Sequence, residues 1–243
     1  MTDLSVQLFS VRDALGDRTA ETFARLHDLG YRDVEPYDIV SDPDGLHRLL
    51  SEAGLEAPSA HASFVRVAPE VVFDAARRIG VGTVILPSAE RSLFGTREGV
   101  VELARVVNRA SALAADRGLV VGYHNHEFEF TARVDGAPAW EVLVDALDER
   151  VVLQLDLHWA SVGGADVFDL LHRYADRIRL LHVNDEPLGV ERGFPPNPSD
   201  RGAVDAALAA AGAVERIVVE VVEQGDVFPS LARNTALFAG VAR

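Results

Sequence analysis

Residues 96–126 read TREGVVELARVVNRASALAADRGLVVGYHNH, and they contain one complete helix-to-strand unit. Apolar residues recur at three- and four-residue spacing over 96–117, which indicates an amphipathic helix. Gly118 is expected to end this helix, because glycine readily adopts the left-handed conformation of a helix cap. The apolar run that follows predicts a buried strand over Leu119–His126, which ends in two histidines.

The same alternation of short apolar strands and amphipathic helices continues in both directions along the chain. The expected strands are 4–10, 31–37, 55–62, 83–87, 119–126, 151–157, 178–183 and 216–222. The expected helices are 19–29, 42–54, 69–80, 96–117, 140–147, 166–174, 202–211 and 231–238. The strands are rich in Val, Leu and Ile, which is typical of strands that are buried on both faces.

Eight such units predict an α/β protein with a single (β/α)8 TIM-barrel domain over residues 1–243. The alternative is an open doubly wound sheet, which is less favoured because no Gly-x-Gly-x-x-Gly motif follows the first strand. One insertion interrupts the alternation at about residues 127–138. Residues 128–134 alternate apolar and polar side chains before Asp135-Gly136, so we expect a short hairpin there.

Composition narrows the classes of function. The chain has 23 basic and 38 acidic residues, a net charge of −15, and no basic stripe, so nucleic acid is not an expected partner. No apolar run is long enough to cross a membrane, and the N-terminus lacks signal-peptide features, so we expect a cytoplasmic protein. There is no cysteine, and all the basic residues are arginine, which excludes thiol nucleophiles and a lysine Schiff base.

Ionisable residues gather where the predicted strands end, and in a TIM barrel the active site lies at the carboxyl ends of the strands. Asp156, His182 and Glu220 end three consecutive strands, which lie about 4.8 Å apart in a sheet. Two carboxylates and an imidazole at one level suit a divalent cation such as Mn²⁺, Mg²⁺, Co²⁺ or Zn²⁺. His124 is the fourth expected ligand if its side chain faces inward.

Several motifs resemble the sugar phosphate isomerase/epimerase family, whose members are xylose-isomerase-like TIM barrels. They are QLFSVR at 7–12, GYRDVE at 30–35, GYHNHEFEF at 122–130, LDLHW at 155–159, LHVND at 181–185 and VVE at 218–220. The resemblance implies metal ligands on strands five to eight, and Asp156, His182 and Glu220 match the last three. The first falls on His124 where many relatives have Glu, although Glu127 or Glu129 is near enough to reach back. Many relatives also carry Lys at the position of Asn184.

The resemblance implies a metal-dependent isomerase or epimerase of a sugar or keto-sugar derivative, which removes a proton next to a carbonyl through an enediolate. It implies a small sugar or polyol as substrate, and it allows a homodimer. We expect three catalytic residues, Glu220, His124 and Glu35. The expected substrate contacts are Arg12, His61, Glu129, His158 and Trp159.

Other functions remain open from the sequence. A dehydratase or lyase that acts on a keto-inositol or 3-keto sugar is the main alternative, and a sugar-binding barrel without catalysis is another. A base-excision endonuclease would need more metal-binding histidines and a basic face. The purely structural alternative for Asp156, Glu220 and Glu35 is a buried ion pair with a barrel arginine. For His124 it is a role in orienting another ligand.

Overall fold

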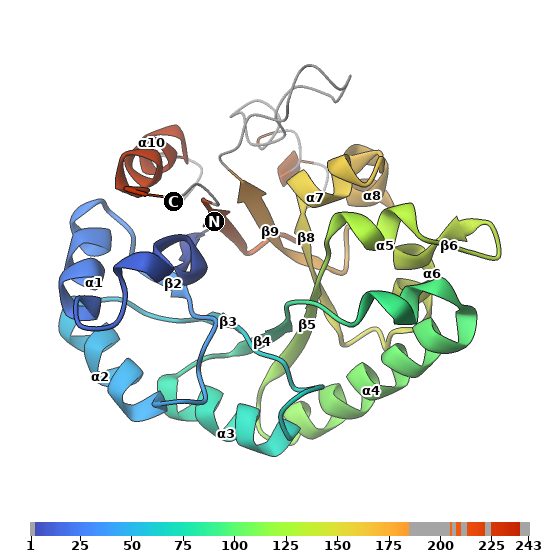
Figure 1. The fold of residues 1–243 in the computed structure, drawn as a ribbon, viewed down its shortest axis with the longest axis horizontal. Helices are drawn as coiled ribbons and strands as arrows, with labels where there is room; N and C mark the ends of the chain where they lie inside the picture. The colour runs from blue at the N-terminus through green and yellow to red at the C-terminus, as the bar shows by residue number, and fades with distance from the viewer. Residues whose placement is uncertain (1–2, 185–204, 206–207, 210–212, 222–224, 239–243) are drawn as a thin grey trace.

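Eight parallel strands line the centre of the molecule, and helices surround them (Figure 1). The computed structural model describes residues 3–184, 205, 208–209, 213–221 and 225–238. The central strands are β1 (Asp3–Gln7), β2 (Asp33–Glu35), β3 (Ser59–His61), β4 (Thr83–Leu86), β5 (Val120–His124), β8 (Val152–Asp156), β9 (Ile178–Asn184) and β10 (Arg216–Glu220).

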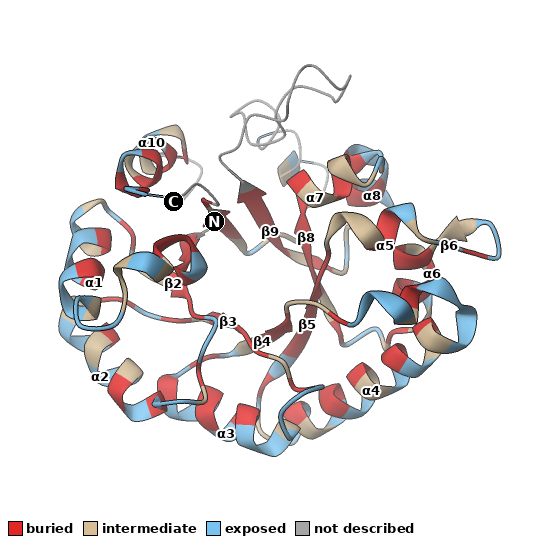
Figure 2. Ribbon diagram, in the orientation of Figure 1, coloured by how far each residue is buried: buried red, intermediate tan, exposed pale blue. Residues whose placement is uncertain are grey.

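The helices that cover the strands turn their apolar faces inward, so that buried residues face the strands and exposed residues face outward (Figure 2). They are α1 (Thr19–Asp28), α2 (Pro43–Ala53), α3 (Pro69–Ile79), α4 (Arg97–Ala115), α6 (Ala139–Ala146), α8 (Val167–Arg173) and α10 (Phe228–Phe238). Short helices follow some of the strands: η1 (Leu8–Ala14), η2 (Arg91–Gly95), α5 (Glu127–Thr131) and α7 (Leu157–Val162). No helix among the described residues is long and apolar enough to cross a membrane.

Local sequence signals set the helix boundaries. Helix α4 begins after Thr96, whose hydroxyl accepts a hydrogen bond from the backbone N–H of Gly99. Helix α2 begins in the same way at Asp42 and ends at Gly54, which has a φ of 68°. A side chain at that φ is strained, which explains why glycine ends the helix.

The strands follow the order β2-β1-β10-β9-β8-β5-β4-β3, so β2 and β3 are the two ends of the hydrogen-bonded ladder. These two strands meet through little backbone pairing. A parallel bridge joins Asp33 to Glu56, and the N–H of His61 donates to the carbonyl of Pro36 at 2.8 Å. We call this junction the seam. The predicted eight-stranded barrel is confirmed, and its second and third strands are joined by a single bridge and a few backbone hydrogen bonds.

The segment after β5 differs from the expected strand, because residues 127–131 form helix α5. The Glu129 carboxylate accepts a hydrogen bond from the backbone N–H of His126 at 2.6 Å, which stabilises the first turn of the helix. Five residues are too few for the apolar period to separate a helix from a strand. A short antiparallel pair follows the helix, formed by β6 (Arg133–Val134) and β7 (Ala137–Pro138).

Two of the strands that end earlier than their sequences suggest run directly into short helices. β1 ends at Gln7, because the chain turns into the η1 helix, and β8 ends at Asp156, because α7 begins at Leu157. The Asp156 carboxylate caps that helix by accepting from the N–H of Trp159 at 2.7 Å. The expected helix at 202–211 lies almost entirely outside the described residues.

Candidate metal centre

Four predicted ligands, one at the end of each of four neighbouring strands, lie close together inside the barrel. The Nδ1 atom of His182 lies 3.3 Å from Asp156 Oδ2 and 3.6 Å from Glu220 Oε2. The Nε2 atom of His124 lies 4.0 Å from the same Asp156 oxygen. The ligand atoms of Asp156, His182 and Glu220 are all within 4.8 Å of one another. The structure therefore brings together the four residues that the sequence predicted as metal ligands.

Asp156 is held so that one carboxylate oxygen faces this centre. Its Oδ1 caps α7 through the N–H of Trp159, which leaves Oδ2 for the histidines. Its backbone is fixed by Asn125, whose side-chain amide accepts from the Asp156 N–H at 2.9 Å and donates to the Asp156 carbonyl at 3.1 Å. Asp156 and His182 are also direct partners in the register of β8 and β9.

The ring of His124 is oriented by Gln154 on the neighbouring strand. Its Nδ1 lies 3.0 Å from the Oε1 atom of Gln154, while the Nε2 atom of Gln154 donates to Glu35 at 2.8 Å. Because a carbonyl oxygen can only accept, His124 Nδ1 carries the hydrogen and Nε2 keeps its lone pair. That nitrogen, Nε2, lies 4.0 Å from Asp156 Oδ2.

The arrangement fits a divalent cation. Asp156 Oδ2, a carboxylate oxygen of Glu220 and the Nε2 of His124 are acceptors, and the Nδ1 of His182 becomes one when its ring is neutral. Among the described residues, the His182 ring is the donor placed next to Asp156 Oδ2 and Glu220 Oε2. Ligand atoms about 2.1 Å from a tetrahedral metal lie about 3.4 Å apart, which the observed spacings of 3.3, 3.6 and 4.0 Å approach.

The pKa values of His182, Glu220 and His124 indicate that this centre favours a bound positive charge. Burial alone would lower the pKa of His182, but the carboxylates of Asp156 and Glu35 raise it to about 10. Burial raises the pKa of Glu220, and the His182 ring partly offsets this. Burial and the neighbouring imidazoles hold the pKa of His124 well below its usual range, so His124 is neutral. A cation bound here would replace the proton of His182.

Glu35 is completely buried behind this centre and accepts several hydrogen bonds. The side-chain amide of Gln7 donates to Oε1 at 2.9 Å, and the hydroxyl of Ser59 and the amide of Gln154 donate to Oε2 at 2.5 and 2.8 Å. His61 Nε2 lies 3.0 Å from Oε1. Burial alone would raise the pKa of Glu35, but the imidazoles of His61 and His182 hold it well below its usual range.

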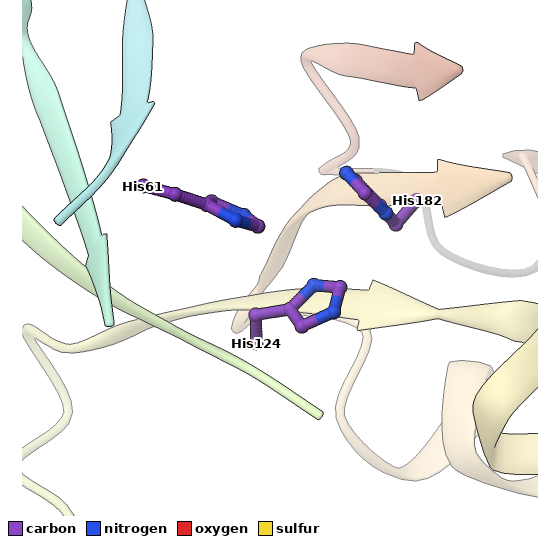
Figure 3. Close-up of side chains that lie close together, drawn as sticks. All are labelled: His61, His124 and His182. Atoms are coloured by element: carbon purple, nitrogen blue, oxygen red, sulfur yellow. The ribbon is translucent and has the colours of Figure 1, made fainter. Parts of the chain in front are cut away.

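Three imidazole rings, those of His61, His124 and His182, gather from β3, β5 and β9 (Figure 3). One nitrogen of each lies within 4.8 Å of the others, which is close enough for a second metal ion. However, Gln154 Oε1 already accepts from the Nε2 of His61 at 2.7 Å and from the Nδ1 of His124 at 3.0 Å. The amide therefore takes the place that a second cation would occupy, and the mixed carboxylate–imidazole group is the better metal site.

The residues predicted to contact substrate have different surroundings. His61 is buried at the end of β3, and His158 is buried in the first turn of α7. Trp159 is partly exposed beside His126, and Arg12 is partly exposed over the Phe9 ring. Glu129 is fully buried, and its two carboxylate oxygens accept from the Tyr123 hydroxyl and the His126 N–H. This explains its position structurally, and a contact between Glu129 and substrate stays a prediction.

The sequence reasoning missed the neutral polar residues that orient the ligands. Gln154 lies two residues before Asp156, and residues two apart in a strand share a face, so alternation from Asp156 would have placed it inside the barrel. Ser59 follows from the same rule, because it lies two residues before His61 in β3, and Gln7 is the last residue of β1. The structural alternative, a buried ion pair with an arginine, is not seen among the described residues, where the ion pairs of Glu35, Asp156 and Glu220 are with histidines.

A family model described as "Xylose isomerase-like TIM barrel" matches residues 23–234. Among curated proteins, an inosose dehydratase of Geobacillus kaustophilus is 35% identical over 80 residues. That alignment covers 32% of this chain and only 25% of the relative.

Solved structures share the fold over the whole chain. A sugar phosphate isomerase/epimerase of Parabacteroides distasonis superposes with a TM-score of 0.82 at 20% identity, covering 100% of this chain and 96% of the other. An IOLI protein with a bound zinc atom superposes with a TM-score of 0.65 at 14% identity, covering 100% and 99%. At these identities the likeness establishes the fold alone.

Proposed function

The chain belongs to the xylose isomerase-like TIM barrel family, and from that premise we propose that it is a divalent-metal-dependent isomerase or epimerase of a sugar or keto-sugar derivative. The observation that carries the proposal is the convergence of His124, Asp156, His182 and Glu220 on one point, with acceptor atoms at ligand spacing. A zinc atom is bound in the IOLI protein of the same fold, which supports a divalent metal as the cofactor.

The reaction needs a proton to leave the carbon next to a carbonyl. A cation held by the four ligands would supply Lewis acidity, which stabilises the negative charge that develops on the substrate oxygens. Glu220 is our choice for the general base, because its side chain is 13% exposed whereas the side chains of Asp156 and His182 are completely buried. Burial also raises its pKa, which brings a carboxylate nearer to the range that suits a base at neutral pH.

The other residues hold the substrate and exclude water. His124, if it is not a ligand, can donate or take the proton on the opposite face of the substrate. We propose that His61, His158 and Arg12 bind hydroxyl groups, and that the partly exposed ring of Trp159 packs against the apolar face of a sugar. Glu35 was expected to act on substrate, but it has no exposed surface. We therefore propose an indirect role for Glu35.

A dehydratase that acts on a keto-inositol or 3-keto sugar is the second candidate. The local match to an inosose dehydratase favours it, as does a histidine in place of glutamate on the fifth barrel strand. Both reactions begin with the same proton abstraction. They differ only in whether the proton returns to carbon or a β-hydroxyl group leaves.

Incubation with a panel of keto sugars and inososes in D₂O with Mn²⁺, followed by NMR, tests the proposal. Deuterium incorporation at the carbon next to the carbonyl, together with a rearranged sugar, is the expected result. Loss of water with a new ultraviolet absorbance would identify the dehydratase instead. A purified protein that binds no divalent metal, or that binds sugars without deuterium uptake, would overturn the proposal.

A further inference from the structure

A directed chain of hydrogen bonds runs from the backbone of η1 to the metal centre. It begins at the N–H of Phe9, which donates to the Oε1 atom of Gln7 at 3.1 Å. A backbone N–H can only donate, so the carbonyl of the Gln7 amide must face it, and the amino group must face Glu35. Gln7 Nε2 does lie 2.9 Å from Glu35 Oε1.

The chain continues through Glu35 to His124. Glu35 accepts at both oxygens, so the amino group of Gln154 faces Oε2 and the carbonyl of Gln154 faces the histidines. That carbonyl requires a hydrogen on His124 Nδ1, and the lone pair is thereby placed on Nε2. Each link fixes the direction of the next. Glu35 also lies 3.5 Å from His182 Nε2, so the tautomer of His124, rather than metal affinity alone, is the readout that isolates this route.

We propose that Glu35 is a positioning residue that, through Gln154, fixes His124 in the tautomer whose Nε2 is free to bind a cation. The role in metal binding rests on the proposed function, whereas the tautomer is a property of the protein without metal. Glu35 thus sets the tautomer of His124 through the side chain of Gln154.

The substitution Glu35→Gln tests this, because an amide cannot accept on both sides. Its amino group would face the amino group of either Gln7 or Gln154. Gln7 is held by the N–H of Phe9, which can only donate. The two rings that face the Gln154 carbonyl, those of His61 and His124, can instead move a hydrogen to their other nitrogen, so Gln154 is the amide that turns over. Its amino group would then face His124 Nδ1, and the hydrogen of the ring would move to Nε2.

The measurements are ¹⁵N NMR of histidine-labelled, metal-free protein and calorimetric titration with Mn²⁺. Wild-type His124 is expected as the Nδ1–H tautomer, and Glu35→Gln as the Nε2–H tautomer with a Kd for Mn²⁺ raised about 10- to 100-fold. Ser59→Ala is the matched comparison, since it removes another hydrogen bond to Oε2 without turning Gln154, and the wild-type tautomer is expected. Circular dichroism shows that each variant is folded.

A double-mutant cycle keeps the test decisive. Gln154→Leu should weaken Mn²⁺ binding about as much as Glu35→Gln, and the two together should be no worse than one, because they interrupt the same chain. Additive losses, or an unchanged tautomer in Glu35→Gln, would overturn the proposal. If Glu35→Gln does not fold, the tautomer in Gln154→Leu decides instead, and retention of the pure Nδ1–H form overturns the proposal. A wild-type protein that turns over no sugar would remove the proposed function but leave the tautomer result standing.

Discussion

Two glutamates in this chain are both completely buried, yet their pKa values move in opposite directions. Glu35 lies in the barrel interior among three neutral donors and two imidazoles, which keep it ionised. Glu129, within α5, faces one hydroxyl and backbone N–H groups, and burial raises its pKa to about 8. Burial alone therefore does not decide the charge of a carboxyl group here, and the number and charge of its neighbours do.

This contrast predicts that neutral amide substitutions should damage the interior and spare Glu129. The largest effect is expected for Asp156→Asn. The amide oxygen can still cap α7, but the negative charge next to His182 and the cation is lost. We expect no measurable turnover and at least a roughly 100-fold weaker binding of Mn²⁺, measured by calorimetry and by metal content after purification. Full metal occupancy in this variant would show that Asp156 is not a ligand.

Glu220→Gln is expected to slow proton abstraction about 10²- to 10⁴-fold, because the general base is replaced by a group that cannot take a proton. Deuterium uptake by the substrate measures this directly. Glu90→Gln, at an exposed carboxylate paired with Arg66, serves as the control and should match the wild type. Equal rates for Glu220→Gln and wild type would move the role of base to another residue.

Glu129→Gln is expected to alter how stability depends on pH. The pKa of Glu129 is raised from 4.5 to about 8, so between these values the folded state keeps a proton that the unfolded state has released. The free energy of unfolding of the wild type therefore falls as the pH rises through this window. The variant has no carboxyl group to titrate at this position. Its free energy of unfolding, compared with that of the wild type at the same pH, should therefore be higher at pH 8 than at pH 5.

Urea unfolding of the wild type and the variant at both pH values measures the effect. Glu127→Gln in the same helix is the control, and stability should still fall between the two pH values, because the buried Glu129 carboxyl is retained. A parallel loss of stability in wild type and Glu129→Gln would show that another group titrates.

The smallest effect is expected for Tyr123→Phe, which removes only the hydroxyl that donates to Glu129. We expect a loss of about 1 kcal/mol in the free energy of unfolding, measured by urea denaturation at pH 5. Metal binding should not change, because the contact lies outside the interior network. A larger loss would mean that the Glu129 region contributes more to folding than its hydrogen bonds suggest.

The ligands could be predicted from the sequence because charged residues stand out in apolar strands. Asp156, His182 and Glu220 each follow several buried residues, and the geometry of a barrel brings strand ends together. The orienting residues could not be found so easily, because Gln154 and Ser59 are neutral and common in many settings. Helix α5 was missed for a different reason, since its first turn is stabilised by a buried carboxylate that looks like a surface residue in the sequence.

The seam between β2 and β3 gives the Glu35 network a second consequence. Ser59 and His61 on β3 both reach across the seam to Glu35 on β2, where the backbone has few hydrogen bonds. Side chains therefore add to the backbone hydrogen bonds of the seam, in which the N–H of Val34 donates to Glu56 and the N–H of His61 donates to Pro36. In native-state hydrogen exchange, the amides of His61 and Val34 would report opening of this seam. Local opening of the barrel would then begin beside the residues that orient the ligands of the candidate metal centre.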